Sequence, residues 1–270
     1  MSSAGSHQSP YDLPGLETSL AATIFAGKLH FAAATGSTNT DAMQAARASA
    51  PQGSVFFADE QNAGRGRGDH AWHSPAGDGL YVSVLFRPSL PLGRLPFLSF
   101  AAGLAAAHAV NGTTGLAVDL RWPNDLLHGP RKVGGLLVES STEGGNLAFA
   151  VVGVGINVHQ RSFDPALSTP GTSLDIETGR TNQRQSLLIA LLKALAIEIA
   201  SLHIREQAQQ IPRRVEAAST WIRGRRVVVH GPQACTGITA GLDAHGFLLV
   251  ETETGLVTVQ TGGIRAADIS

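Results

Sequence analysis

This sequence has a single cysteine, a polar N-terminal segment and no long uninterrupted apolar run. It has one cysteine, Cys235, in 270 residues. No disulfide can therefore form within the chain, and a reducing compartment such as the cytoplasm is expected. The first ten residues are polar and lack the apolar segment of a secretory signal peptide. No run of 18 residues is apolar throughout, so we expect no membrane-spanning helix.

Charge is also scarce, at 15% of residues, and the 20 basic and 21 acidic side chains leave a net charge of −1. A disordered chain would carry more charge and fewer aliphatic residues, since 43% of this sequence is hydrophobic. A charge so close to zero creates no overall field that attracts nucleic acid or a membrane surface. We therefore expect a globular protein with neither of these partners.

The texture of the sequence changes near Trp221. Before it, strands are expected at 28–33, 54–60, 79–86, 117–121, 132–140 and 147–158, and helices at 13–26, 42–50, 92–110 and 184–219, the last with a break near Ile211 and Pro212. Short links between the last three strands favour antiparallel pairing. After Trp221, strands are expected at 227–230, 234–243, 246–251 and 255–260, a spacing typical of a small β-barrel. The pattern predicts an α+β domain followed by a small β module.

Residues 61–78 form a long segment without hydrophobic periodicity, and long loops in compact domains are usually functional. Its centre, 64–68, reads Gly-Arg-Gly-Arg-Gly. Glycine lets the backbone approach a ligand closely, and the planar donors of arginine match carboxylate or phosphate oxygens. The pattern indicates an anion-binding loop, with a solvated turn or an RNA-binding Gly-Arg segment as alternatives.

Lysine is unusually rare, because 17 of the 20 basic residues are arginine and Lys28, Lys132 and Lys193 are the three lysines. Lys132 lies at the start of an apolar strand, and a single valine separates it from Gly134 and Gly135. A compact ammonium in such a place suits close contact with a phosphate. The alternative is an exposed charge at the end of a strand.

Two further segments favour a pocket. Pro123 excludes a helix at Trp122, and the indole beside Asn124 and Asp125 indicates either a pocket wall or a turn over a core tryptophan. The strand at 151–158 holds Gly-Val-Gly but lacks the third glycine and the following helix of a dinucleotide fingerprint. These glycines indicate close backbone approach, here of a flat ligand, and make Asn157 a candidate hydrogen-bonding group.

A resident metal site is not expected. His70 and His73 flank Trp72, but no cysteine or carboxylate lies at a metal-ligand spacing from them.

The order of these segments resembles the bacterial biotin protein ligases. The resemblance rests on GSTN at 36–39, DEQNAGRGR at 59–67, Trp72, RWPNDL at 121–126, KVGGLLVE at 132–139 and GVGIN at 153–157. It implies a class II synthetase-like catalytic domain at 29–220, with a mixed, largely antiparallel sheet and helices. A tail and short helix at 1–28 would precede it, and an SH3-like β-barrel at 221–270 would follow. Residues 1–28 are too few for a winged helix-turn-helix, which implies the monofunctional type without DNA binding.

The resemblance implies an enzyme that joins biotin to ATP, forming biotinoyl-5′-AMP and pyrophosphate with Mg²⁺. The biotinoyl group then passes to a lysine of a biotin carboxyl carrier protein of acetyl-CoA carboxylase. A monomer or a homodimer is expected. The nearest alternative is a lipoate-type protein ligase, and a second is a non-catalytic biotin sensor, against which the intact Lys132 argues.

The same resemblance assigns site residues. Biotin would contact Ser37, Thr38, Asn39, Gln61, Arg65, Gly66, Arg67, Lys132 and Gly135. The nucleotide would contact Trp72, Asn124, Lys132 and Asn157, and the catalytic set is Lys132, Arg67 and Asp125. One departure is that the loop continues as Gly68-Asp69-His70-Ala71, without the further basic residues of many relatives, which predicts a weaker electrostatic grip.

Overall fold

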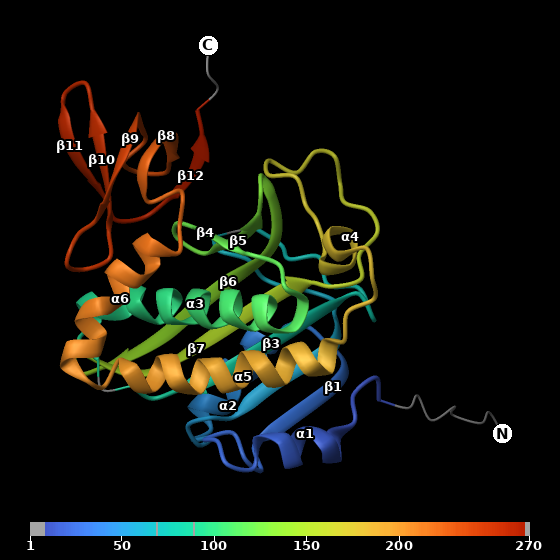
Figure 1. The fold of residues 1–270 in the computed structure, drawn as a ribbon. Coiled ribbons are helices and arrows are strands. Elements are labelled where there is room, and N and C mark those ends of the chain that lie inside the picture. The colour runs from blue at the N-terminus through green and yellow to red at the C-terminus, as the bar shows by residue number, and fades with distance from the viewer. Residues whose placement is uncertain (1–8, 69, 89, 268–270) are drawn as a thin grey trace.

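Two β-sheets and a layer of helices make up the molecule (Figure 1). The computed structural model describes residues 9–68, 70–88 and 90–267. Most of the expected N-terminal tail, residues 1–8, and Asp69 of the glycine-rich loop lie outside the described residues, as do residues 268–270 of the C-terminal module.

The larger sheet has seven strands in the order β1-β2-β3-β7-β6-β5-β4. They are β1 (Leu29–Thr35), β2 (Val55–Gln61), β3 (Gly79–Phe86), β4 (Asp119–Arg121), β5 (Asp125–His128), β6 (Arg131–Glu143) and β7 (Asn146–Asn157). β1 and β2 are parallel, and every other neighbouring pair is antiparallel. The mixed, largely antiparallel sheet is therefore confirmed.

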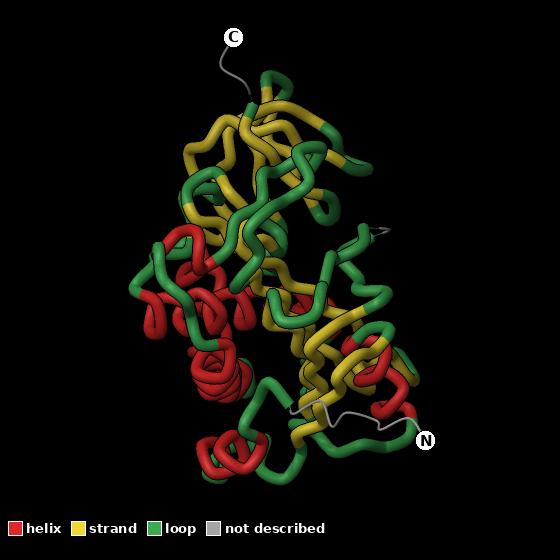
Figure 2. Tube along the Cα trace, turned by 90° about the vertical axis from the view of Figure 1, so that its right-hand side faces the viewer, coloured by secondary structure: helices red, strands yellow, loops and turns green. Residues whose placement is uncertain are grey.

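Helices cover both faces of this sheet, as the view in Figure 2 shows. They are α1 (Leu13–Leu20), α2 (Thr38–Arg47), α3 (Leu95–Thr114), α4 (Leu174–Thr178), α5 (Arg184–Ser201) and α6 (Arg205–Ala217), with a 3-10 turn η1 (Leu92–Arg94) before α3. The main core joins α3 and α5 to β3, β6 and β7. A small second core on the opposite face holds Ala42 and Ala46 of α2 against Leu85 and Val151. Because both faces are covered, β3 is buried at every position.

The C-terminal sheet has five antiparallel strands in the order β11-β10-β9-β8-β12. They are β8 (Arg223–His230), β9 (Cys235–Leu242), β10 (Leu248–Thr252), β11 (Gly255–Val259) and β12 (Gly263–Ala266). It lies at one end of the molecule, beyond α6 (Figure 1). The expected small β module is thus present, with one strand more than the pattern predicted.

The helical region before it differs from the prediction. The expected break near Ile211 and Pro212 is wrong, because α5 ends at Ser201, α6 begins at Arg205 and Pro212 lies inside α6. Ile211 is fully buried, and Arg214 forms a bidentate ion pair with Glu198 of α5 at 2.7 and 2.5 Å. Packing and this pair hold the helix together across a proline that removes one hydrogen bond. Strand β5 and helix α4 were not predicted.

One apolar helix passes a simple test for a membrane span. Leu92–Thr114 is long and apolar enough to cross a membrane by length and composition alone. Its polar residues, Ser99 and His108 among them, interrupt the run without lowering its mean hydropathy below that of a spanning helix. More than half of its most apolar window, 56%, is buried inside the protein, where α3 packs between the sheet and α5. Burial of this kind is what a core helix shows.

Candidate active site

A cavity of about 1350 Å³ lies over the large sheet on the face away from the main core. Side chains alternate along a strand, so one face of β7 gives Val152 and Ile156 to the core, while Gly153, Gly155 and Asn157 line the cavity. Loops at 62–78 and 159–173 and the C-terminal sheet supply the other walls.

Every residue that the sequence assigned to biotin, the nucleotide or catalysis lines this cavity. They are Ser37, Thr38, Asn39, Gln61, Arg65, Gly66, Arg67, Trp72, Asn124, Asp125, Lys132, Gly135 and Asn157. The fold therefore brings together residues up to 120 positions apart in the chain (157 − 37). Their individual roles stay predictions.

The start of α2 forms a polar end of the cavity. Ser37 is the N-cap residue of α2, although its side chain makes no capping hydrogen bond. The helix begins at Thr38, four residues before the predicted start at Ala42. Gln61 at the end of β2 accepts from the Thr38 backbone N–H at 2.9 Å and lies 3.1 Å from its hydroxyl. Ser83 of β3 lies 2.8 Å from the Thr38 hydroxyl and donates to Asn39 Oδ1 at 2.6 Å. Sequence reasoning missed Ser83, which carries no motif of its own.

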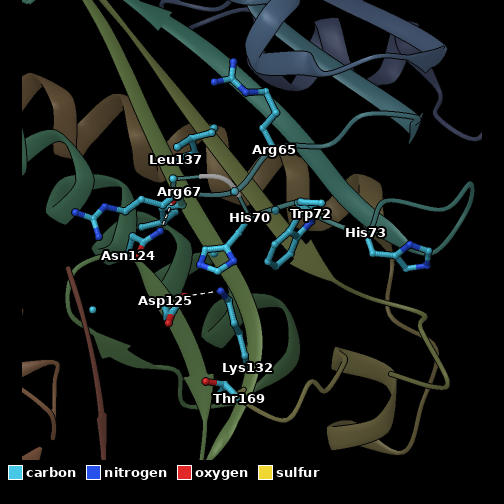
Figure 3. A pocket seen from close by; sticks show the side chains of 18 of the residues that line it. Arg65, Arg67, His70, Trp72, His73, Asn124, Asp125, Lys132, Leu137 and Thr169 are labelled. Carbon is cyan, nitrogen blue, oxygen red and sulfur yellow. Dashed lines mark hydrogen bonds and ion pairs between the residues drawn. The ribbon is translucent and has the colours of Figure 1, made fainter. Parts of the chain in front are cut away.

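Glu139 of β6 connects this polar network to the glycine-rich loop. Its Oε2 accepts from Asn39 Nδ2 at 2.9 Å, and its Oε1 pairs with Arg65 Nη2 at 2.9 Å. Figure 3 shows Arg65 directed away from Lys132. The sequence analysis assigned no role to Glu139, and the structure makes it the partner of both Asn39 and Arg65.

Lys132 forms an ion pair with Asp125, with Nζ 2.5 Å from Oδ1 (Figure 3). The other carboxylate oxygen of Asp125 accepts from Arg121 Nε at 3.1 Å and Nη2 at 2.5 Å. Burial by itself would raise the pKa of Asp125, but Lys132 and Arg121 outweigh it and hold that pKa below its ordinary value. Asp125 is therefore a carboxylate at neutral pH.

The indole of Trp72 lies flat on two strand glycines. A Cβ added to Gly155 would lie 2.6 Å from the indole Nε1, and one added to Gly135 would lie 3.3 Å from the ring. The space beside Gly155 is thus occupied by a side chain of the protein itself, and a flat ligand at these glycines stays a prediction. Trp72 Nε1 is buried and has no hydrogen-bond partner among the residues that the structure describes, and Lys132 Nζ lies 5.3 Å from the ring centroid.

Arg67 reaches from the loop to the C-terminal sheet. Its Nη2 donates to Thr261 Oγ1 at 2.8 Å and its Nη1 donates to the carbonyl oxygen of Gly262. Burial lowers the pKa of Arg67, and the charge of nearby Asp125 opposes that shift. The loop arginine is thus directed at the C-terminal sheet rather than at the seven-stranded sheet.

Two predicted nucleotide ligands hold the backbone of the cavity walls. Asn124 Nδ2 donates to the carbonyl of Leu136 at 2.7 Å, and Asn157 Nδ2 donates to the carbonyl of Thr172 at 2.9 Å. Within the described residues, no group of three or more His, Cys, Asp or Glu side chains could hold a metal ion.

Comparison with known proteins gives a consistent result. Residues 31–157 match the Biotin/lipoate A/B protein ligase family, and residues 223–264 match the biotin protein ligase C-terminal domain. The chain is 32% identical over 245 residues to the biotin–[acetyl-CoA-carboxylase] ligase of Mycobacterium tuberculosis, covering 88% of each. It is 30% identical to the bifunctional ligase/repressor BirA of Bacillus subtilis, covering 85% of this chain and 71% of that one.

A solved structure shares the fold. The biotin protein ligase from Aquifex aeolicus in complex with biotin and ATP superimposes with a TM-score of 0.76 and 28% sequence identity. The superposition covers 88% of this chain and 98% of that chain, so it includes both sheets.

Proposed function

Because the chain belongs to the biotin protein ligase family, we propose that this cavity is the active site of a biotin–[acetyl-CoA-carboxylase] ligase. The enzyme activates biotin with ATP to biotinoyl-5′-AMP and releases pyrophosphate. It then transfers the biotinoyl group to a lysine of the biotin carboxyl carrier protein. The observation that carries the proposal is the Lys132–Asp125 pair, which lies in the same cavity as the polar network at the start of α2.

The polar network is suited to the ureido ring of biotin. Ser37 is a buried residue whose side chain makes no capping bond to α2, and Gln61 and Asn39 are fixed by Thr38 and Ser83. A ureido group presents N–H donors and a carbonyl acceptor to such a set. The dithiolane ring of lipoate has neither, and would leave these groups unpaired at about 1–3 kcal/mol each. This favours biotin over lipoate.

The first step brings a carboxylate against a triphosphate, so like charges must be neutralised. The biotin carboxylate attacks the α-phosphorus, a new P–O bond forms, and the bond to the leaving pyrophosphate breaks. Lys132 and Arg67 both line the cavity and are proposed to stabilise this transition state, Arg67 by giving up its bonds to Thr261 and Gly262, and Mg²⁺ enters with ATP as part of the substrate. Arg65 adds a third positive charge when it gives up its ion pair with Glu139 and binds the ligand instead.

The second step needs a lysine amine close to the acyl carbon of the mixed anhydride. The amine attacks the acyl carbon, a C–N bond forms, the C–O bond to AMP breaks, and the proton lost by the nitrogen passes to water as AMP leaves. Asp125 is a carboxylate at neutral pH and lies beside Lys132, so it orients the incoming amine by accepting its N–H. Trp72, Asn124 and Asn157 are proposed to bound the nucleotide.

The remaining assignments are proposals of the same kind. The catalytic domain spans 29–220 and the C-terminal module 221–270, with the boundary at the buried Trp221. The enzyme works in the cytoplasm as a monomer or homodimer and binds no nucleic acid.

Exchange of labelled pyrophosphate into ATP tests the first step, with biotin or lipoate added separately. Biotin-dependent exchange and a matching mass increase on a carrier domain are expected. Equal exchange with both acids would favour the lipoate-type alternative, and biotin binding without exchange would favour a sensor.

A further inference from the structure

We propose that Arg121 is a positioning residue. It fixes the position of the Asp125–Lys132 pair relative to the loop at 161–172 and to the C-terminal sheet. The proposal rests on the function proposed above for Asp125 and Lys132. Arg121 touches neither substrate in this assignment and acts through the groups that it binds.

The hairpin between β4 and β5 places Arg121 opposite Asp125. Arg121 is the last residue of β4 and Asp125 the first of β5, and the two are partners in the antiparallel register. Both Arg121 bonds to the carboxylate go to Oδ2, which leaves Oδ1 for Lys132 at 2.5 Å. Arg121 therefore decides which oxygen of Asp125 faces the catalytic lysine.

The same guanidinium reaches the loop at 161–172. Nη2 donates to Thr169 Oγ1 at 2.9 Å, across 48 residues of sequence. This loop is also bound to the backbone of Lys132, which donates to the Pro170 carbonyl at 2.8 Å and accepts from the Thr172 N–H at 2.9 Å. Lys132 and Asp125 are thus both tied to one loop, the first by its backbone and the second through Arg121.

The third contact of Arg121 is with the start of the C-terminal module. Its guanidinium lies 5.3 Å from the centroid of Trp221, which is buried just before β8. Arg121 makes three hydrogen bonds and also lies against an indole ring. The planar guanidinium of arginine can make all of these contacts at once. The ammonium of a lysine could not make them in the same fixed directions. With a side chain 8% exposed, Arg121 also needs these partners to offset the cost of burying its charge.

The charges that face Asp125 come from three elements. Arg121 approaches from β4 and Lys132 from β6, and Arg67 of the glycine-rich loop adds a more distant positive charge. Without Arg121, the buried carboxylate of Asp125 keeps Lys132 as its one direct ionic partner. The pKa of Asp125 then rises, and Asp125 is protonated up to a higher pH. A purely structural role of Arg121 would not produce this change.

The test measures transfer of biotin from purified biotinoyl-AMP to the carrier domain between pH 5 and 9. It uses the full chain and the variants Arg121→Met, Arg121→Lys and Thr169→Val. In Arg121→Met we expect transfer at pH 7 to fall roughly 10- to 100-fold and the acid limb of the profile to move to higher pH. Arg121→Lys restores the position of the acid limb but not the rate. Thr169→Val loses rate without moving the limb.

Arg225→Met is the matched control, because Arg225 stacks on the same Trp221 at 4.0 Å without bonding to Asp125. Thermal unfolding of each variant reports stability. A wild-type rate and pH profile in Arg121→Met overturns the proposal, as does full recovery of the rate by Arg121→Lys. Should the Met variant not fold, the Lys and Thr169 variants decide the question. Absence of any transfer by the wild type would instead refute the proposed function.

Discussion

Lys132 shows how one side chain acquires a function from its surroundings. It is one of three lysines in a chain that otherwise uses arginine, and its ammonium lies between the carboxylate of Asp125 and the ring of Trp72. The space between these groups fits a compact charge with three rotatable donors. A planar guanidinium would need to displace one of them.

We therefore expect Lys132→Ala to slow adenylation roughly 30- to 1,000-fold, the loss of about 2–4 kcal/mol of charge stabilisation. Lys132→Arg should recover little of this rate. Pyrophosphate exchange measures both variants, with the unfolding temperature as a check that the fold is intact. Near-normal exchange in the Arg variant would show that Lys132 is merely a strand-end charge.

Ser83 is the residue through which the polar network is fixed. It is fully buried and touches both Thr38 and Asn39. Ser83→Ala removes the donor to Asn39 Oδ1, at a cost of about 1–3 kcal/mol, and should raise the KM for biotin roughly 5- to 150-fold. Ser54→Ala is the control, because Ser54 is equally buried but bonds to the Pro51 carbonyl outside the cavity. Equal effects of the two substitutions would remove Ser83 from the biotin site.

At the scale of elements, the sheet positions the site by simple alternation. Gly153, Gly155 and Asn157 of β7 line the cavity; Gly153 lies against Asn39 and Gly155 against Trp72. If the register of β7 shifted by one residue, these glycines would face the core and the neighbouring valines would face the cavity. The antiparallel pairing of β3, β7 and β6 therefore fixes the cavity floor.

The glycine-rich loop is the element expected to retain the intermediate. Arg67 ties it to the C-terminal sheet, and closure of the loop would shield the mixed anhydride from water. Arg67→Gly should therefore weaken retention of biotinoyl-AMP more than it slows its formation. The variant is mixed with biotin, MgATP and serum albumin, and biotin on the albumin is measured. Labelling no higher than with wild type, with the intermediate still retained, would exclude this role.

At the scale of the whole molecule, the C-terminal sheet forms part of the active-site wall. Thr261 and Gly262 bind Arg67, Trp221 lies against Arg121, and Gly246 accepts from the indole of Trp122, so several contacts join the module to the site. Gly262 has a φ of +122°, and an added Cβ would lie 2.0 Å from the carbonyl oxygen of His230. A side chain at this position must therefore displace the segment that Arg67 binds.

Gly262→Ala should thus release biotinoyl-AMP faster than the wild type, in the direction of Arg67→Gly but through the opposite partner. Gly263→Ala is the control, because its added Cβ meets no atom within 4 Å. Rapid filtration after single-turnover adenylation measures the release rate. Identical release from the two alanine variants would mean that the contact with the loop does not retain the intermediate.

The sequence by itself determined most of the strands, the antiparallel pairing of β6 with β7, the small C-terminal module and the residues that gather at the cavity. These follow from local information, namely periodicity, turn residues and the order of short motifs. It did not determine the partners within the site. Glu139 holds Asn39 and Arg65, Arg121 reaches Thr169 and Trp221, and Arg67 binds Thr261, in each case far along the chain. Only the tertiary structure decided these contacts, because they depend on the register of the sheet and the packing of loops against it. No pattern in neighbouring residues records either.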